Sequence, residues 1–188
     1  MIQVVFFLEE PSAREMLKGL LPKLLPEHWS IQYVVFEGKQ DLEKRLPLRL
    51  RAWKNPRARF IVLRDKDSED CIKVKQRLVE ICRGSGKPET LVRIACHELE
   101  SWYLGDLTAV AKSIGPTRVA RLQAKQKYRS PDRLANPAQE LKSIASSYQK
   151  VGGSRAIGPN LSLENNCSAS FNAFISGLHR LMENGATA

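Results

Sequence analysis

Phe60-Ile61-Val62-Leu63-Arg64-Asp65-Lys66-Asp67 is an apolar run that ends abruptly in two aspartates, and this stretch decides the fold. The run predicts a strand, and ligands in open α/β sheets bind outside the carboxyl ends of the strands. Side chains two positions apart on an extended segment point the same way, so Asp65 and Asp67 are expected to face one cation together. Their hard oxygen ligands suit Mg²⁺ or Mn²⁺. The alternative is a strand followed by an aspartate-capped helix, because Ser68 and Asp70 resemble a helix start.

The chain around this stretch alternates between strand and helix patterns. Near-continuous apolar runs predict strands buried on both faces, and leucines at helical spacing predict helices between them. This alternation is typical of βαβ units on a parallel sheet. We therefore expect an α/β fold with a central, mostly parallel four-stranded sheet flanked by helices. The predicted strands are 2–8, 31–36, 60–64 and 91–96, and the predicted helices begin near Pro11, Asp41 and Ser68.

After His97 the pattern becomes helical, and we expect an α-helical C-terminal half. The expected helices lie near 99–113, 116–126, 136–150 and 168–183, with breaks at Ser130-Pro131-Asp132 and Gly152-Gly153. The basic, polar segment from Lys125 to Arg133 is expected to be a surface loop. The predicted organisation is an α/β core over residues 1–113 and a helical extension over 114–188 that packs on this core, so that the chain forms one compact unit.

Charge and composition bound the classes of function. The 188 residues suffice for one domain with a substantial core, and 30 Lys plus Arg against 20 Asp plus Glu leave a net charge of +10. This surplus favours DNA or RNA as a partner, although basic charge also aids solubility. Four widely spaced cysteines without a C-x-x-C pair argue against a zinc site or a disulfide framework. The apolar start, Met1 to Leu8, is too short to span a bilayer. We expect a cytoplasmic protein without a membrane partner.

Acidic residues follow three of the four predicted strands. They are Glu9 and Glu10, Asp65 and Asp67, and Glu98 and Glu100. One acidic strand end is ordinary, because helices favour acids in their first turn, whereas three that converge at one edge of a parallel sheet indicate a site. Lys39, after the second strand, would add a cation that holds a phosphate or stabilises developing charge. The alternative for Lys39 is a solvated loop lysine.

These features resemble the TOPRIM domain that topoisomerases, primases and overcoming-lysogenization-defect (OLD) nucleases share. In both, a hydrophobic strand ends in glutamate, a βαβ crossover follows, and a later strand ends in Asp-x-Asp. More closely, most of the chain resembles a bacterial family, domain of unknown function family 4276. The motifs are Leu8-Glu9-Glu10-Pro11-Ser12, Gly38-Lys39-Gln40-Asp41-Leu42, Leu63-Arg64-Asp65-Lys66-Asp67 and Arg93-Ile94-Ala95-Cys96-His97-Glu98-Leu99-Glu100-Ser101-Trp102-Tyr103-Leu104-Gly105-Asp106. The resemblance implies a TOPRIM-like, Rossmann-like fold. It also implies a role in phage defence with an AAA-type or ABC-type ATPase partner, because the family's genes often lie beside ATPases in defence-type neighbourhoods.

The resemblance also implies roles for individual residues. Glu9 matches the TOPRIM glutamate that serves as general acid/base or metal ligand, and Asp65 and Asp67 match its metal-binding pair. Glu10 stands where that pattern usually has glycine, which adds bulk where backbone would approach a ligand closely. Because adjacent residues on an extended segment point to opposite sides, we expect only Glu9 to face the two aspartates.

Two further sets of candidates belong to the narrower family and to the basic surface. Glu98 or Glu100 could complete a shell around Mg²⁺ or Mn²⁺. Residues two apart on a helix diverge by roughly 200°, so both would face one ion only from an extended segment. The candidate contacts to a nucleic-acid backbone are Lys125, Lys127, Arg129 and Arg155. For the first three, a solvated helix face is an equally good explanation.

Two hypotheses from different classes follow. The first is a divalent-metal-dependent nuclease or phosphotransfer protein that acts on nucleic acid, with Glu9 and Lys39 as catalytic residues. The second is a non-catalytic, TOPRIM-like regulatory or binding subunit of an ATPase complex. Metal-dependent cleavage of DNA or RNA by the pure protein separates them.

Overall fold

The computed structural model describes residues 2–186, with side chains described for residues 2–183. Its centre is a four-stranded parallel sheet in the order β2-β1-β3-β4, which confirms the predicted sheet. The inner strands β1 and β3 are almost wholly buried, and β2 and β4 form the two edges. The strands are β1 (Gln3–Leu8), β2 (Ser30–Val35), β3 (Ala58–Asp65) and β4 (Leu91–Ala95).

Helices connect successive strands, as parallel pairing requires. They are α1 (Pro11–Leu20) with the 3₁₀ turn η1 (Leu21–Lys23), α2 (Lys39–Arg51) and α3 (Cys71–Gly84). Pro11 occupies the first turn of α1, where its missing N–H is not needed. Asp70 accepts a hydrogen bond from the amide of Lys73 and so caps α3. Both starts were signalled by the sequence.

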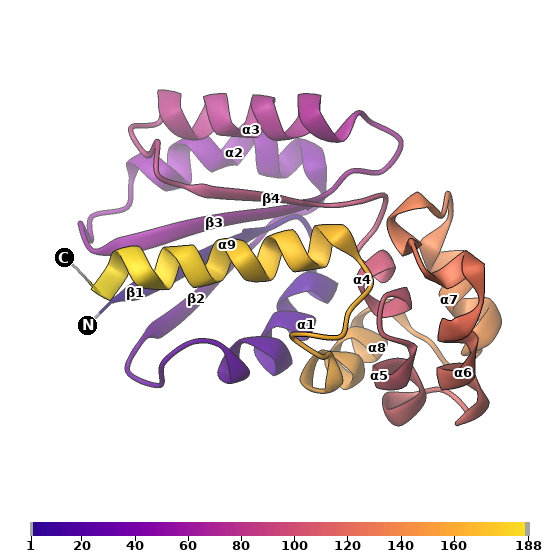
Figure 1. Cartoon of the computed structure of the whole chain (residues 1–188). Coiled ribbons are helices and arrows are strands. Elements are labelled where there is room, and N and C mark those ends of the chain that lie inside the picture. The colour runs from indigo at the N-terminus through magenta and orange to yellow at the C-terminus, as the bar shows by residue number, and fades with distance from the viewer. Residues whose placement is uncertain (1, 187–188) are drawn as a thin grey trace.

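Side chains of the inner strands alternate between two hydrophobic cores. The core shared with α2 and α3 contains Val5, Phe7, Phe60 and Val62. The opposite core, shared with α1 and the second half of the chain, contains Val4, Phe6, Leu8, Ile61 and Leu63. Figure 1 shows α2 and α3 above the sheet, and α1 and α9 (Ala169–Ala186) below it. This alternation sets the sides to which the residues at the ends of β1 and β3 point.

The second half is helical, as predicted, but its helices are shorter and more numerous than the periodicity indicated. They are α4 (Glu100–Leu104), α5 (Leu107–Ser113), α6 (Arg118–Arg121), α7 (Pro137–Ile144), α8 (Lys150–Ile157) and α9, with the 3₁₀ turns η2 (Leu122–Ala124), η3 (Gln126–Tyr128), η4 (Pro131–Arg133) and η5 (Gly158–Asn160). The expected helix 99–113 divides at Gly105, where a side chain would collide with Asn166, and Asp106 caps the new helix.

The predicted break at Gly152-Gly153 is wrong, because both glycines lie inside α8. A Cβ on Gly153 would lie 2.4 Å from the Tyr148 ring, so glycine is required there for close packing and not for a turn. The helix predicted over 136–150 ends at Ile144, and α8 starts at Lys150. This start places Lys150 beside the carboxyl ends of the strands.

The helical half packs on the lower face of the sheet. Trp102 of α4 is fully buried against Phe171 and Phe174 of α9, and α9 also contacts β4. Figure 1 shows the short helices α4 to α7 gathered beside the ends of the strands. None of the helices in residues 2–186 combines the length and the apolar character that crossing a membrane requires.

Candidate functional site

The strand ends send neighbouring side chains to opposite faces of the sheet. β1 and β3 pair with Leu8 opposite Leu63, so the same register places Glu9 level with Arg64 and Glu10 level with Asp65. Arg64 lies on the side of α2 and α3, where it contacts Glu43. Asp65 lies on the opposite side, with the helical half of the chain.

Asp65 shares that side with two other carboxylates, Glu10 and Glu100. We call Glu10, Asp65 and Glu100 the inner carboxylates. Glu100, the first residue of α4, is 1% exposed, and its Oε1 accepts a 2.7 Å hydrogen bond from the Tyr148 hydroxyl. Lys150 Nζ lies 2.6 Å from Glu10 Oε2. One ammonium group therefore stands among three carboxylates.

The balance of charge in this cluster perturbs its acids. Burial, followed by the charges of Glu10, Glu100 and Glu9, holds the pKa of Asp65 well above the usual carboxyl range. Burial also raises the pKa of Glu100, against the opposing effect of the Tyr148 hydrogen bond. Groups that resist ionisation in this way are typical of sites that bind a cation or transfer a proton.

A second group of charges, the outer cluster, consists of Glu9, Lys39, Asp67 and Glu69. Glu9 Oε2 accepts a 3.1 Å hydrogen bond from the main-chain amide of Asp65. Lys39 Nζ lies 2.8 Å from Asp67 Oδ2 and 3.8 Å from Glu69 Oε1. Burial raises the pKa of Glu9, and the hydrogen bond to Asp67 raises the pKa of Lys39. The structure thus places both proposed catalytic residues, Glu9 and Lys39, beside the aspartate motif.

A buried arginine underlies the outer cluster. The Arg64 side chain is fully buried and contacts Glu43 and Glu69, which Arg77 of α3 also binds. Its Nε has no hydrogen-bond partner among the described residues and lies 3.9 Å from Glu9 Oε2. This network fixes the position of Glu69 and places the positive charge of Arg64 close to Glu9. The sequence signal for it was a charged residue inside an apolar strand, which our sequence reasoning did not use.

The two aspartates of the motif engage different partners, although their spacing predicted that they would face one cation together. β3 ends at Asp65, and Asp67 has a positive φ of 55°. The period-two rule therefore no longer applies at Asp67, whose carboxylate turns to Lys39 on α2. Asp65 stays with the inner carboxylates. Glu9 lies between the two groups, with its pKa also raised by the charge of Asp67.

Glu10 is closer to Asp65 than the sequence suggested. We expected only Glu9 to face the aspartates, but the register places Glu10 on the same side of the sheet as Asp65. Glu10 is also the carboxylate with the strongest effect on the Asp65 pKa. The alternation of side chains holds, and its phase is the reverse of the one assumed.

Glu98 and Glu100 diverge, as expected for a segment that is not extended. Glu98 precedes α4, and its Oε2 accepts a 2.9 Å hydrogen bond from the amide of Ala138. Glu98 therefore satisfies one of the free amides at the start of α7. The structure brings Glu100, and not Glu98, to Asp65.

The four basic candidates lie on helices and turns of the second half. Lys125 and Arg129 are exposed, with Arg129 donating to the carbonyl of Ala124. Lys127 Nζ lies 2.6 Å from Glu140 Oε2, and Arg155 Nε lies 2.8 Å from Glu15 Oε2, so both cations are paired with an acid. The segment from 125 to 133 forms 3₁₀ turns at the end of the molecule where the strands end (Figure 1).

The donor chemistry of the inner carboxylates fits a hard divalent cation. The Asp65 carboxylate receives no hydrogen bond from the described residues, and Glu100 Oε2 is buried with no partner among them. Carboxylate oxygen atoms that receive no hydrogen bond are free to coordinate Mg²⁺ or Mn²⁺. Within residues 2–186, no group of three or more acidic, histidine or cysteine side chains is already arranged to hold a metal ion.

Two residues of this site were not among the sequence candidates. Lys150 and Tyr148 come from the start of α8 and the turn before it, far along the chain from the strands. No motif marked them, because only the packing of α8 against α1 brings them to Glu10 and Glu100.

Comparison with known proteins supports the fold and identifies the family. The C-terminal region of the Burkholderia pseudomallei OLD protein has a similar structure, with a TM-score of 0.51 and 16% sequence identity over 95% of this chain and 97% of that chain. At this identity the likeness shows the fold, and it confirms the predicted TOPRIM-like architecture. No curated protein matches the chain significantly. The model of DUF4276, a domain of unknown function, matches residues 8–179. Because this match spans most of the sequence, the chain belongs to the DUF4276 family.

Proposed function

We propose that this protein is a divalent-metal-dependent nuclease-type phosphodiesterase that acts on DNA or RNA. The observation that carries the proposal is the buried Asp65 carboxylate, which has no hydrogen-bond donor among the described residues and is surrounded by Glu9, Glu10 and Glu100. A mostly buried carboxylate that receives no hydrogen bond and lies among other carboxylates destabilises the fold, and the charge of Lys150 offsets only part of this cost. A ligand that is absent from the free protein explains it better than packing does.

We assign metal binding, proton transfer and charge stabilisation to different residues of the site. Asp65 and Glu100, with Glu10, would hold Mg²⁺ or Mn²⁺, which supplies a Lewis acid for a phosphoryl oxygen and lowers the pKa of a bound water. Glu9, with a raised pKa and 14% of its side chain exposed, is suited to take a proton from the attacking water. Lys39, 40% exposed at the start of α2, is placed to stabilise negative charge on the phosphate.

A second function is favoured by a different observation. Lys39 and Lys150 already neutralise Asp67 and Glu10 by direct ion pairs. A site balanced in this way also suits a non-catalytic subunit that keeps the fold and binds a partner, such as an ATPase in a defence system. We rank this function below the first because it leaves Asp65 without a role.

The test is cleavage of labelled DNA and RNA by pure protein in Mg²⁺ or Mn²⁺, compared with EDTA. Glu9→Gln should abolish cleavage, because it keeps the shape and the hydrogen bond from the Asp65 amide but removes the charge. Glu37→Gln is the matched control, because Glu37 is an exposed glutamate just after β2 at the same edge of the sheet. Equal loss in both variants would contradict a role for Glu9. A parent protein that cleaves nothing with either metal would favour the binding subunit.

A further inference from the structure

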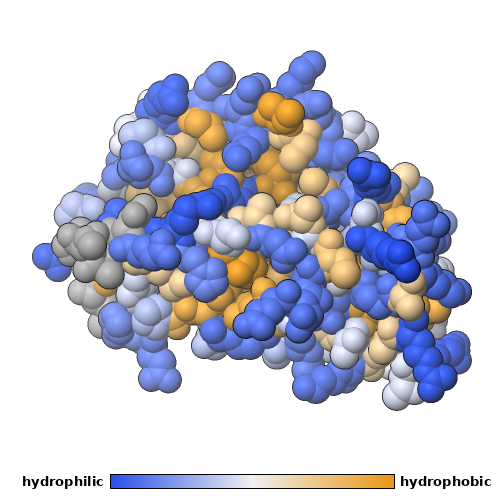
Figure 2. Space-filling view, viewed as in Figure 1, coloured by the Kyte–Doolittle hydropathy of each residue, from blue (hydrophilic) through white to orange (hydrophobic). Residues whose placement is uncertain are grey.

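A groove runs along the free edge of β4, one of the two edge strands of the sheet. Two adjoining hollows form it, and Arg180 of α9 lines both of them. The groove is bounded by α3 on one side and α9 on the other, and it extends from Leu91 at the start of β4 to Cys96 just after its end. Figure 2 views this face, where hydrophilic side chains lie among apolar ones between the two helices.

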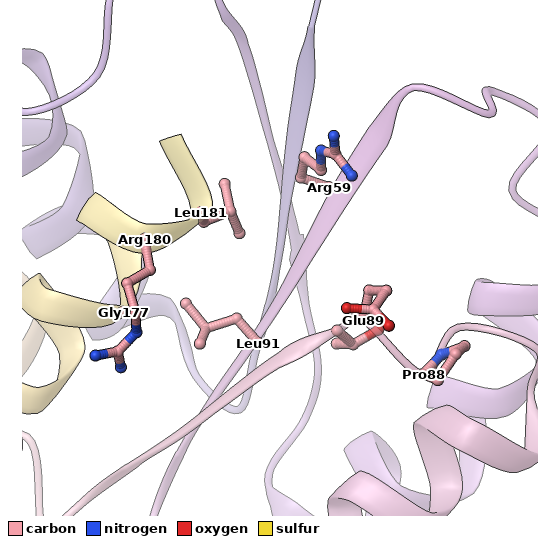
Figure 3. Close-up of a pocket in the computed structure, with 8 residues that line it drawn as sticks. Arg59, Pro88, Glu89, Leu91, Gly177, Arg180 and Leu181 are labelled. Atoms are coloured by element: carbon pink, nitrogen blue, oxygen red, sulfur yellow. The ribbon is translucent and has the colours of Figure 1, made fainter. Parts of the chain in front are cut away.

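Basic side chains from four elements, β3, α3, β4 and α9, line this groove along its length. Figure 3 shows Arg180 on α9 and Arg59 on β3 on opposite sides of Leu91. Further along, Lys75 of α3 and Arg93 of β4 line the second hollow. The acidic lining residues are Glu89 and Asp132, and the Asp132 carboxylate is occupied by Ser168 and by the amide of Ser170.

Three of these cations have no acidic partner. Lys75, Arg93 and Arg180 form no ion pair with any residue that the structure describes. Lys127 and Arg155, which the sequence suggested for nucleic acid, are in contrast paired with Glu140 and Glu15. Unpaired cations in a common hollow attract an anion more strongly than paired ones do.

Hydrogen bonds to two main-chain carbonyls hold the Arg93 side chain in place in the groove. Its Nε donates to the carbonyl of Ala173 and its Nη1 to the carbonyl of Val92, which leaves further N–H groups unused. Its guanidinium packs so closely on α9 that a Cβ on Gly177 would lie 2.5 Å from Nη2. Burial and the charge of Arg180 lower the pKa of Arg93. Two arginines held within electrostatic range without a carboxylate are stabilised when an anion binds between them.

The Arg93 side chain also decides what kind of partner fits. It crosses from the edge of β4 to α9, and a charged side chain in this position protects an edge strand against pairing with another strand. A polyanion meets no such obstacle. Cys96 lines the far end of the groove, and the next residue, His97, accepts a hydrogen bond from the main-chain amide of Asp67 through its carbonyl. We propose that the groove between α3 and α9 binds the sugar–phosphate backbone of the nucleic acid and leads it toward the inner carboxylates. This inference rests on the proposed function.

The experiment measures binding without cleavage. A short fluorescein-labelled oligodeoxythymidine and its RNA counterpart are titrated with protein in EDTA, and fluorescence anisotropy is followed over a range of salt concentrations. The test variant is Lys75→Gln/Arg180→Gln, which changes exposed side chains and leaves the structural Arg93 in place. Lys73→Gln/Arg118→Gln is the matched control, because it removes the same charge from exposed residues of α3 and α6 that do not line the groove.

We expect the test variant to bind about tenfold more weakly, and the slope of log K against log salt to fall by about 1.4, since each phosphate contact of a single strand contributes about 0.7. The control should keep nearly the parental slope. The proposal is overturned if both variants lose affinity equally or if the parent does not bind. It is also overturned if polyglutamate displaces the oligonucleotide more readily than unlabelled nucleic acid does, because this result would indicate an acidic protein partner. If the parent shows Glu9-dependent cleavage but Lys75→Gln/Arg180→Gln binds as tightly as the parent, the groove proposal is wrong and the proposed nuclease function stands.

Discussion

The main-chain amide of Asp67 donates a 2.7 Å hydrogen bond to the carbonyl of His97, and both residues have positive φ, 55° and 61°. This bond ties the loop after β3 to the loop after β4. Left-handed backbone is unfavourable for residues with a side chain, and such strain gathers at functional sites. Here it has a definite effect, because it turns Asp67 toward Lys39 and away from the direction set by β3.

The strain predicts opposite effects of two substitutions at His97. Glycine adopts positive φ freely, whereas a β-branched residue does not. His97→Gly should therefore be more stable than His97→Val by about 1–2 kcal/mol in the free energy of unfolding. Both variants remove the contact of His97 with Lys66 Nζ, so the comparison isolates the backbone. Urea denaturation measures the difference, and equal stabilities would show that the loop relaxes without strain.

The two aspartates of the motif should respond differently to neutralisation. The folded-state pKa of Asp65 is raised above its ordinary value of 3.8. The stability contributed by its protonated form is therefore fully present below that value and is lost as the pH rises through the raised pKa. In EDTA at neutral pH, Asp65→Asn should thus melt at a higher temperature than the parent. Asp67→Asn should lose up to about 1 kcal/mol, because it breaks the partly exposed pair with Lys39.

Metal ions provide the second half of that comparison. Mg²⁺ or Mn²⁺ should raise the melting temperature of the parent and should no longer do so in Asp65→Asn. Asp65→Asn should therefore melt above the parent in EDTA and should lose this advantage when the metal is added. If Asp65 had a purely structural role, the variant would not melt at a higher temperature than the parent in EDTA. A parent whose melting temperature is unchanged by either metal would remove the basis for a cation at the inner carboxylates.

The four strands and their parallel pairing were accessible from the sequence, because burial on both faces leaves a direct record in apolar runs such as 60–63. Their order in the sheet was not predicted. The position of Glu9, Asp65 and Lys39 at one edge followed from parallel pairing. The orientation of Asp67 did not follow, because the spacing rule holds only while the chain is extended and β3 ends at Asp65. Lys150 and Tyr148 were out of reach for a different reason, since tertiary packing of α8 brings them to the site.

Tyr148 should contribute to stability through the charge of Glu100. Its hydroxyl is the hydrogen-bond donor to Glu100 Oε1, and Oε2 has no partner among the described residues. Tyr148→Phe should therefore reduce the free energy of unfolding by about 1–3 kcal/mol. Tyr103→Phe is the control, because its hydroxyl bonds the neutral Ser154 and its loss should cost about 1 kcal/mol.

A double-mutant cycle tests that assignment. In a Glu100→Leu background the effect of Tyr148→Phe should shrink, with a coupling energy of at least about 0.5 kcal/mol. Additive losses would show that Tyr148 acts by packing alone, for example through its ring contact with Tyr103.

Lys150 should compete with a metal ion for the inner carboxylates. Burial opposes its charge, but the hydrogen bond to Glu10 and the charges of Glu10, Glu100 and Asp65 outweigh burial and raise its pKa, so it is fully charged at neutral pH. Lys150→Met should destabilise the protein in EDTA at neutral pH, because three carboxylates lose their counterion. It should also bind Mg²⁺ or Mn²⁺ up to about tenfold more tightly, which corresponds to about 1.4 kcal/mol. Calorimetric titration measures both metals, with Lys39→Met as the matched variant at the outer cluster. If Lys39→Met and not Lys150→Met gains affinity, the ion binds at Asp67 and the assignment to Glu10, Asp65 and Glu100 is wrong.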